Sequence, residues 1–322
     1  MPGPVVSVLE FAHAYTIPIG WVTAGVFLAA ALVEYHDRDL ARPVAVVAWV
    51  LFAAFWFSLI DFYLLVQKSA IEGVGSILAV PLSLWIGYKL WTGRDSLFVL
   101  TRAIAVMALI YVPFVRFELL RKPLIEVVTV QTEFVVNALG YHPEVVDGLI
   151  LEGWGEIGPK THPYRSTFVF YKEEAAPITY TIKLACTGLG SMALVGGLIA
   201  AVRAPISRKV RAMAIAIPVI WVLNIVRNVF ISISFGEQYM HLLPDLIGAL
   251  FALSDPRMVS FIVADRIVAQ SLSVLALLMI TWLIVKELPE LVTVLEDVIY
   301  LVSGRDYDLQ EAIGARPPES GD

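Results

Sequence analysis

Long apolar stretches separated by short polar connections run through most of this chain. A helix needs about 20 mostly apolar residues to cross the hydrocarbon core of a bilayer. Seven stretches of this kind are present: 15–33, 43–66, 74–91, 97–115, 183–202, 212–235 and 259–285. The pattern therefore predicts an all-α polytopic membrane protein with about seven transmembrane helices.

The composition supports lipid rather than water as the main solvent. Of the 322 residues, 58% are hydrophobic and only 16% are charged, and the mean hydropathy is +0.77. Soluble domains carry about 25% charged residues. A protein this apolar could not cover its surface with polar groups, so we expect one membrane bundle rather than two soluble domains. No basic stripe for nucleic acid is evident.

Basic residues are unevenly divided between the connections. The connections at 34–42, 89–96 and 203–211 hold eight Lys and Arg residues, whereas the N-terminus and the connections at 67–73 and 236–258 hold only Lys68 and Arg257. Short loops rich in Lys and Arg stay in the cytoplasm. The bias predicts that the N-terminus lies outside and the C-terminus inside.

The segment 116–182 then lies outside the membrane, and its pattern predicts a small cap. Apolar residues from Leu124 to Leu139 recur at helical spacing, as expected of an amphipathic helix at the interface. The runs 166–171 and 178–182 are typical of strands, and 172–177 would turn between them. We therefore expect one amphipathic helix followed by a short β-hairpin.

The C-terminal segment differs from the rest in charge. Residues 286–322 hold three basic and nine acidic residues, which accounts for the whole net charge of −6. Apolar positions between Leu288 and Val302 recur at helical spacing, which predicts a surface helix at the cytoplasmic side. The residues from Asp306 onward have the composition of a disordered tail.

Three spans carry residues that could perform chemistry at a similar depth. Asn224, Arg227 and Asn228 share one helix face, because their spacing is i, i+3 and i+4. Arg227 lies roughly 12 Å, and Arg266 roughly 10 Å, from the outer end of its span at 1.5 Å per residue. Cys186, the only cysteine, lies in the first turn of the fifth span. A thiol and two guanidinium groups are thus predicted at one level.

Each of these residues also has a simpler interpretation. A lone cysteine in an apolar chain is most often a small packing residue. Either arginine could pair with a lipid headgroup or a carboxylate, such as Asp265 beside Arg266. Their common depth favours chemistry instead, because a neighbouring guanidinium favours the reactive thiolate and a second can stabilise an oxyanion. Two buried arginines also require a negatively charged group between them.

At these residues the sequence resembles the exosortase/archaeosortase family. Residues 185–191, Ala-Cys-Thr-Gly-Leu-Gly-Ser, resemble its Ala-Cys-(Ser/Thr)-Gly nucleophile motif, and residues 224–227, Asn-Ile-Val-Arg, resemble its Asn-x-x-Arg motif. The family's third position is histidine in exosortases and arginine in archaeosortases. Here Arg266 occupies that place, 39 residues after Arg227, which is itself 41 after Cys186. The resemblance covers residues 116–285 and is strongest to the archaeosortase branch.

The resemblance implies a membrane-embedded cysteine protease or transpeptidase that needs neither cofactor nor metal. It implies Cys186 as nucleophile, with Arg227 and Arg266 stabilising thiolate, oxyanion or substrate. The surrounding positions implied to bind substrate are Thr187, Gly188, Asn224 and Asn228. The division along the chain would be 1–115 for an N-terminal four-helix half, 116–182 for the cap, 183–285 for a catalytic three-helix core and 286–322 for the acidic tail.

The resemblance also implies partners and a place in the cell. Expected substrates are secreted or S-layer proteins that end in a Pro-Gly-Phe-type motif, an apolar sorting helix and a basic tail. The new C-terminus would be transferred through a thioester to a prenyl-type membrane lipid. The protein would be a multi-pass plasma-membrane protein whose active site faces the exterior.

Two other functions stay open from the sequence. A polytopic transporter with a charged exterior-facing site would also place ionisable residues within spans, although no internal repeat supports it. An intramembrane protease that releases its product to water would use the same residues. The general base is not identified, because no histidine lies within a span; His142, His162 and His241 are expected in solvated exterior loops.

Overall fold

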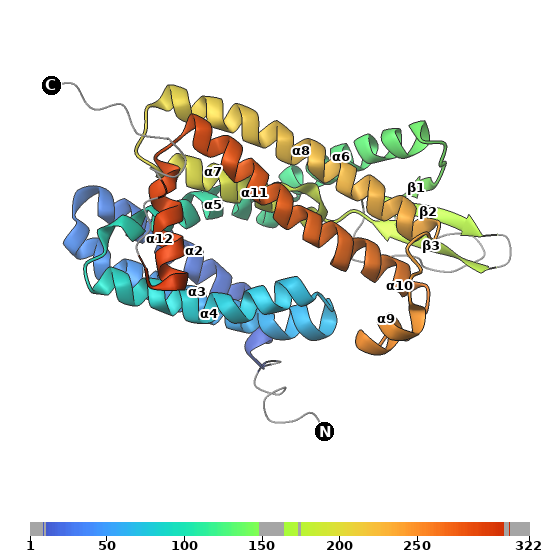
Figure 1. Cartoon of the computed structure of the whole chain (residues 1–322), viewed down its shortest axis with the longest axis horizontal. Coiled ribbons are helices and arrows are strands. Elements are labelled where there is room, and N and C mark those ends of the chain that lie inside the picture. Colours follow the sequence, from blue (N-terminus) through green and yellow to red (C-terminus); the bar gives the residue numbers. More distant parts are fainter. Residues whose placement is uncertain (1–8, 10, 148–163, 173–174, 306–308, 310–322) are drawn as a thin grey trace. The chain divides into compact units, whose positions relative to one another are not determined.

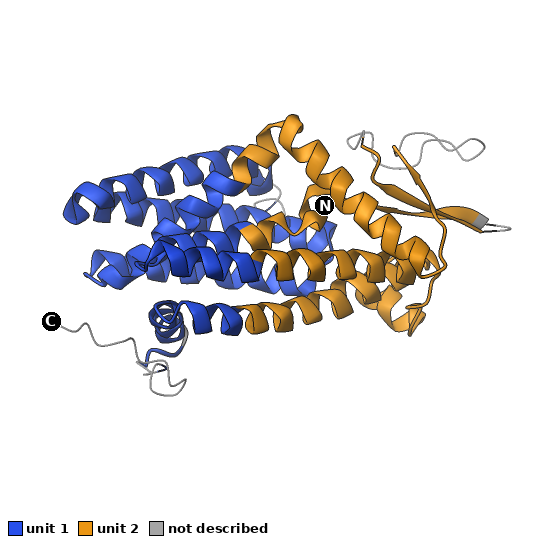
Figure 2. Cartoon of the chain, turned by 90° about the horizontal axis from the view of Figure 1, so that it is seen from above, with its two compact units in different colours: residues 1–110, 193–216, 281–322 blue, residues 111–192, 217–280 orange. Residues whose placement is uncertain are grey.

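The computed structural model of the chain describes residues 9, 11–147, 164–172, 175–305 and 309. The described part is mostly helical and contains one small sheet (Figure 1). Its contacts divide the chain into two compact units. Unit 1 comprises residues 1–110, 193–216 and 281–322, and unit 2 comprises residues 111–192 and 217–280 (Figure 2).

Six helices in the described part are long and apolar enough to cross a membrane. They are α2 (Thr16–His36), α3 with its π-helical end η1 (Arg38–Val66), α4 (Ala70–Trp91), α5 with the turn before it (Asp95–Arg116), α8 (Ile206–Gly236), and the continuous helix α10–η4–α11 (Met258–Glu287). The predicted class, a helical multi-pass membrane protein, is confirmed.

The predicted span at 183–202 has a different form. Its helical part is α7 (Leu189–Ala201), which has 13 residues and is about 20 Å long at 1.5 Å per residue. The hydrocarbon core of a bilayer is about 30 Å thick. The residues before α7 instead form a 3₁₀ turn, η3 (Leu184–Thr187), which a left-handed Gly188 separates from the helix.

Unit 1 is built on close packing between α2, α3 and the helices beside them. Its core contains large buried side chains such as Phe27, Trp49 and Leu90, and fully buried alanines that let the helix backbones approach. Trp49 Nε1 donates a hydrogen bond of 3.1 Å to Thr101 Oγ1, which joins α3 to α5 and satisfies the buried indole.

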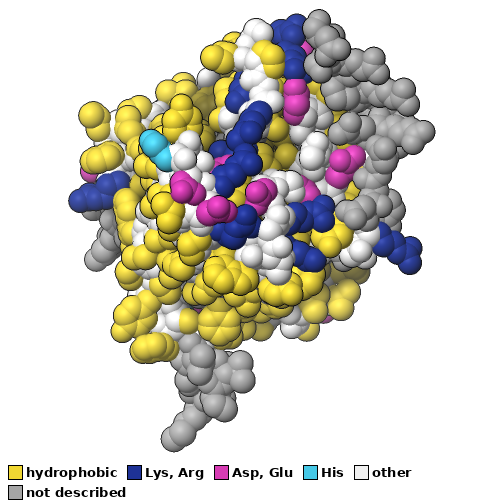
Figure 3. Space-filling view, turned by 90° about the vertical axis from the view of Figure 1, so that its left-hand side faces the viewer, with side chains coloured by type: hydrophobic (Ala, Val, Ile, Leu, Met, Phe, Trp, Pro, Cys, Tyr) yellow, Lys and Arg dark blue, Asp and Glu magenta, His cyan; other side chains and the backbone are white. Residues whose placement is uncertain are grey.

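The three basic connections lie at one end of unit 1 (Figure 1). Their charges form a mixed band with acidic groups in the space-filling view (Figure 3). Three ion pairs in this region are Arg42–Asp95 at 3.0 Å, Arg94–Asp297 at 2.7 Å and Arg208–Glu290 at 2.5 Å. The last two hold the C-terminal segment, where the predicted helix is observed as α12 (Leu291–Ser303).

Unit 2 contains the predicted cap elements. The amphipathic helix is α6 (Glu118–Ala138), and the hairpin is formed by β2 (Thr167–Lys172) and β3 (Ala175–Thr181). A third strand, β1 (Glu144–Val146), pairs antiparallel with β2, so the sheet order is β1-β2-β3. The sequence did not predict β1, because three residues are too short to show an alternating pattern. A short helix, α9 (Pro244–Leu250), was also not predicted.

The sheet of unit 2 packs directly on α8 and α6. Phe168 and Tyr180 are cross-strand partners, and both are buried in a core shared with residues of both helices, such as Val128 and Ile225. A Cβ atom on Gly236 would lie 2.5 Å from the ring of Phe170. This glycine therefore lets the end of α8 approach β2 closely.

Candidate active site

Strand β3 leads straight into the turn that carries Cys186. The Ile182 N–H donates to Ser166 O at 2.9 Å, which ends the strand pairing, and the Cys186 N–H donates to Lys183 O at 2.8 Å. Gly188 then has a φ of +76°, and α7 begins with Met192 N–H donating to the Gly188 carbonyl at 3.0 Å. The cysteine is thus half-buried on a tight turn rather than within a regular helix.

Two asparagines of α8 hold this turn from the side. Asn224 Nδ2 and Asn228 Nδ2 each donate a hydrogen bond of 2.8 Å to the Cys186 carbonyl oxygen. A carbonyl oxygen has two lone pairs, so the two amides together satisfy it. The sequence predicted both asparagines as substrate-binding residues. In the structure both donors contact the backbone carbonyl of Cys186, so they hold the turn in place.

Thr187 and Gly188 shape the same turn. Thr187 is buried, and its Oγ1 donates to the Leu184 carbonyl at 2.7 Å and accepts from the Leu189 N–H at 3.4 Å. A Cβ on Gly188 would lie 3.1 Å from Cβ and Cγ of Asn224. Glycine is therefore favoured at this position for two reasons. The backbone has a left-handed φ, and Asn224 leaves little space for a Cβ atom.

Replacing Gly188 with alanine should destabilise the protein by about 1–2 kcal/mol, because a Cβ is disfavoured in the left-handed region. The clash with Asn224 should add to this loss. Gly190→Ala is the matched control, since a Cβ at Gly190 meets nothing within 4 Å. Denaturant unfolding of the detergent-solubilised protein compares the two variants. Equal stability of both would contradict this account of the turn.

Tyr180 joins this site, although the sequence did not single it out. Its hydroxyl donates a hydrogen bond of 3.1 Å to Asn228 Oδ1 and so fixes the amide that holds Cys186. Burial raises the pKa of Tyr180 well above its usual value; Cys186 and Asp265 raise this pKa further, and Arg227 lowers it. The hydroxyl therefore keeps its proton at neutral pH. The available signal was a tyrosine in the predicted strand 178–182, six residues before the cysteine.

The two predicted arginines meet on one carboxylate. Arg227 Nη2 lies 2.5 Å from Asp265 Oδ1, and Arg266 Nη1 lies 3.3 Å from Asp265 Oδ2. Asp265 and Arg266 lie in η4 (Ile262–Ala269), a π-helical stretch of the kind that often marks functional sites. From the sequence, Asp265 was a candidate partner for Arg266 alone. In the structure it contacts both arginines.

The hydrogen-bonded group around Cys186 and the charged group around Asp265 belong to one site. Arg227 lies on the same face of α8 as Asn224 and Asn228, which bond the Cys186 carbonyl, and it pairs with Asp265. A half-buried thiol, a proton-bearing hydroxyl and paired guanidinium groups are therefore gathered in unit 2.

The histidines considered as bases are placed differently. His142 and His241 are exposed. His162 lies outside the described residues.

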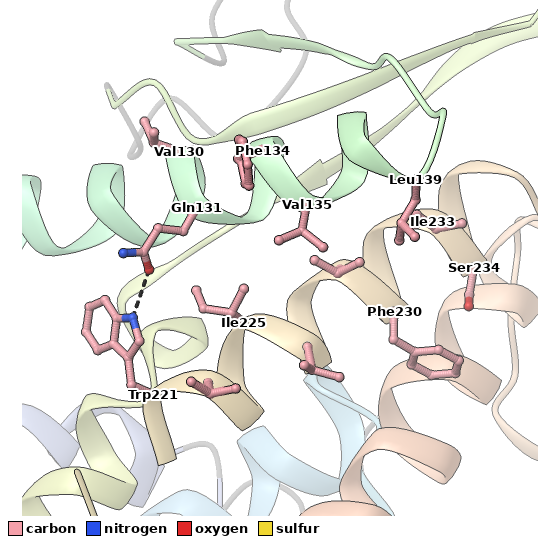
Figure 4. Close-up of a pocket in the computed structure, with 13 residues that line it drawn as sticks. Val130, Gln131, Phe134, Val135, Leu139, Trp221, Ile225, Phe230, Ile233 and Ser234 are labelled. Carbon is pink, nitrogen blue, oxygen red and sulfur yellow. Dashed lines mark hydrogen bonds between the residues drawn. The ribbon is translucent and has the colours of Figure 1, made fainter. Parts of the chain in front are cut away.

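An apolar groove runs along the other side of α8, between it and α6 (Figure 4). Its volume is about 950 Å³, and Trp221 Nε1 donates to Gln131 Oε1 at 2.8 Å across it. The α8 residues that line it include Val222, Val226, Val229 and Ile233. At 100° per residue these positions lie opposite the face of Asn224, Arg227 and Asn228. These four residues therefore line the groove from another face of α8 than the three polar residues.

Comparison with known proteins shows the family to which the chain belongs. Residues 11–254 match the family described as transmembrane exosortase (Exosortase_EpsH). The chain belongs to this family, and it is a multi-pass membrane protein.

Two curated relatives match the chain, and both are named archaeosortase A. Archaeosortase A of Haloferax volcanii is 46% identical over 306 residues, which cover 92% of this chain and 97% of the relative. Archaeosortase A of Natronomonas pharaonis is 41% identical over 298 residues, which cover 92% and 91%. No solved structure matches the chain.

Proposed function

We propose that this protein is a membrane-embedded cysteine transpeptidase that removes a C-terminal sorting signal from secreted proteins. The new C-terminus is first bound to Cys186 as a thioester and is then transferred to a membrane lipid. The observation that carries the proposal is the turn of Cys186, whose carbonyl is held by two asparagines from the helix face that also bears Arg227. Membership of the exosortase family and the archaeosortase A relatives support this reading.

The reaction needs a nucleophile, a site for negative charge and a way to release an amine. The Cys186 sulfur attacks the carbonyl carbon of the scissile peptide bond, and Arg227 and Arg266 stabilise the charge that develops on sulfur and on the carbonyl oxygen. The C–N bond then breaks, its nitrogen takes up the proton that the thiol gave up, and the acyl group stays on sulfur as a thioester. A hydroxyl of the acceptor lipid attacks the thioester carbonyl and forms an ester, the C–S bond breaks, and the hydroxyl proton restores the thiol.

The carboxylate of Asp265 fits this scheme as a positioning group. A guanidinium presents its N–H donors in a fixed plane, so the bond to Asp265 sets the orientation of that plane. The side chain of Arg227 is 24% exposed and that of Asp265 is 7% exposed. Asp265 thus holds the guanidinium from the buried side, while the arginine keeps an accessible edge.

The substrates proposed for this site are secreted or S-layer proteins that carry a Pro-Gly-Phe-type motif before an apolar helix and a basic tail. Such a helix would lie alongside the bundle, which is why a peptidase would hold its nucleophile within the outer leaflet. Thr187 and Gly188, which follow Cys186 in the turn, are proposed to contact the substrate, and the acceptor would be a prenyl-type lipid. The site would face the exterior of the plasma membrane.

Hydroxylamine trapping tests the thioester directly. The full-length protein in lipid nanodiscs is incubated with a model substrate that ends in a sorting helix, with and without hydroxylamine. We expect hydroxylamine to intercept the acyl group, so that mass spectrometry finds a hydroxamate at the new C-terminus. Cleavage that yields only a free carboxylate, even with hydroxylamine present, would exclude a trappable thioester.

The same products separate a transpeptidase from a simple protease. Without hydroxylamine and with archaeal lipids in the nanodisc, the transpeptidase should yield a lipid-linked C-terminus. A free carboxylate under these conditions would indicate an intramembrane protease that uses water as acceptor. A transporter would give no cleavage at all.

A further inference from the structure

The apolar groove between α6 and α8 has a defined length and two different ends (Figure 4). Along α8 it extends from Trp221 to Ser234, a distance of about 20 Å at 1.5 Å per residue. At the first end, the hydrogen bond from Trp221 to Gln131 joins the two walls. At the second end, Leu139 of α6 and Ile233 of α8 form the walls. The groove is therefore bridged at the Trp221 end and extends from there toward the end of α8.

The depth of the groove in the membrane follows from its place on α8. Trp221 is the middle residue of this 31-residue helix, which is one of the six described helices that are long and apolar enough to cross a membrane. The hydrocarbon core is about 30 Å thick, so one leaflet is about 15 Å deep. A groove of about 20 Å that starts at the middle of α8 thus covers one leaflet and reaches its boundary with water. This is the leaflet on the side of the sheet, because the end of α8 packs on Phe170 of β2.

The lining of the groove is suited to hydrocarbon. Only two of the 13 described residues that line it, Gln131 and Ser234, are polar, and Trp221 has its indole N–H bonded to Gln131. Val226 on one wall is 58% exposed and Phe134 on the other is 73% exposed, so the groove opens sideways from the helices. A polar ligand would lose its hydrogen bonds to water in such a place. An empty groove would lose dispersion contacts along its whole length. The occupant is therefore apolar.

The size of the groove favours a lipid over a transmembrane helix as this occupant. A helix with its side chains is about 10–12 Å wide, so a 20 Å length of it displaces about 1,600–2,300 Å³. The groove holds about 950 Å³, so much of a helix would remain outside it. A spanning helix would also continue into the other leaflet, whereas the groove is bridged at the middle of α8. A lipid chain has no more than the depth of one leaflet to fill, as the groove does.

We propose that this groove is a binding site for the hydrocarbon of one membrane lipid, which comes from the leaflet on the side of the sheet. The methyl ends of the lipid lie against the bridge between Trp221 and Gln131, and its headgroup lies beyond Leu139 and Ile233. Helix α6 also packs against η3, the turn that carries Cys186. A lipid between α6 and α8 therefore stabilises the contact between two elements that surround this turn. The proposal does not depend on the proposed function, because lipid binding requires no catalysis.

Photolabelling in mixed micelles tests the site. The full-length protein in detergent receives rising mole fractions of a phospholipid that carries a diazirine near the methyl end of one chain, and mass spectrometry locates the label after irradiation. Labelling at Gln131 and Val222 should saturate, with a midpoint at a mole fraction of about 0.1 if lipid is preferred about tenfold over detergent. Leu275 on α11 is 62% exposed and does not line the groove. Its labelling should rise in proportion to the mole fraction.

The position of the diazirine tests the orientation of the lipid. With the diazirine moved next to the headgroup, the saturable label should appear at Leu139 and Ile233 instead of Gln131 and Val222. The same positions labelled by both probes, or the reverse order, would contradict the orientation proposed here. Labelling of the groove that rises in proportion to the mole fraction would overturn the proposal, because the lipid would then be ordinary boundary lipid.

A variant that fills the groove provides a second test. Val226→Trp places a large apolar side chain on the wall of the groove, so saturable labelling should fall by about tenfold or more if the preference over detergent is lost. Leu275→Trp is the matched control, since it adds an indole to an exposed apolar position outside the groove, and the saturable label should stay. Saturable labelling that persists in a folded Val226→Trp protein would overturn the proposal. The wild-type measurement decides by itself if this variant does not fold.

A competitor distinguishes a lipid from a helix. A 20-residue apolar helical peptide with lysines at both ends, added in excess to the wild-type protein, should leave the saturable label in place. Loss of the label from the groove would assign this surface to a helix and overturn the proposal. None of these outcomes concerns the thioester, so this proposal and the proposed function can fail separately.

Discussion

Replacing Cys186 with alanine should leave the protein folded and stop processing of its substrate. Loss of the nucleophile removes the covalent route altogether, and in enzymes that use one the rate falls by at least about 10⁴-fold. Cleavage of a model substrate in nanodiscs, followed by mass spectrometry, measures the loss. Hydroxamate formation should disappear with it, because no acyl-enzyme can form.

The structure explains why this variant should remain folded. The two asparagine bonds go to the Cys186 backbone carbonyl, which alanine keeps. The side chain is only half-buried, so its removal leaves no large closed cavity. The variant should therefore unfold at nearly the same denaturant concentration as the wild type. A folded Cys186→Ala protein that still processes substrate would show that Cys186 is not the nucleophile.

The helical membrane class could be predicted from the sequence because it depends on long, strong patterns. Six of the predicted spans correspond to helices that are long and apolar enough. Helix α6 and the β-hairpin could also be predicted, because apolar residues recur every 3.6 residues in a helix and every 2 residues in a strand. The span that contains Cys186 was predicted less well. Hydropathy averages over the residues 184–188 and cannot show that Gly188 adopts a left-handed φ.

The residues of the site could be predicted in part for a similar reason. Arginine within apolar helices is rare, so Arg227 and Arg266 stand out from their surroundings. Cys186 stands out as the only cysteine of the chain. What each of them contacts depends on how separate elements pack. The contacts of Tyr180 and Asp265 require β3, α8 and η4 to meet, and a pattern along one element contains no information about the others. The i, i+4 spacing identified Asn224 and Asn228, but it could not show that both donate to the backbone carbonyl of Cys186.

Replacing Asp265 with alanine should have the largest effect on stability of any single change in this site. Its carboxylate contacts both Arg227 and Arg266, and the three side chains are 7%, 24% and 15% exposed. Removing one partner of a buried ion pair typically costs about 3–5 kcal/mol, because the remaining charge is left without compensation. Here two guanidinium groups lose the same carboxylate.

An exposed ion pair of the same unit gives the control. Asp255 and Arg257 are 41% and 44% exposed and lie 3.0 Å apart. Pairs of this kind contribute about 0–1 kcal/mol. Denaturant unfolding in detergent should therefore show a several-fold larger loss for Asp265→Ala than for Asp255→Ala. Similar losses for both would mean that Asp265 does not hold the arginines.

A double-mutant cycle separates the ion pair from the packing of its side chains. Arg227→Gln and Asp265→Asn keep the approximate shapes but remove one charge each, so each single change leaves the other charge buried. The double variant removes both charges and should be more stable than the sum of the single losses predicts, by about 0.5–3 kcal/mol. Additive losses of stability would show that Arg227 and Asp265 do not interact, and this outcome would contradict the ion pair described here. Under the proposed function, processing should fail in all three variants, because each removes either the Arg227 guanidinium or the carboxylate that is proposed to orient it.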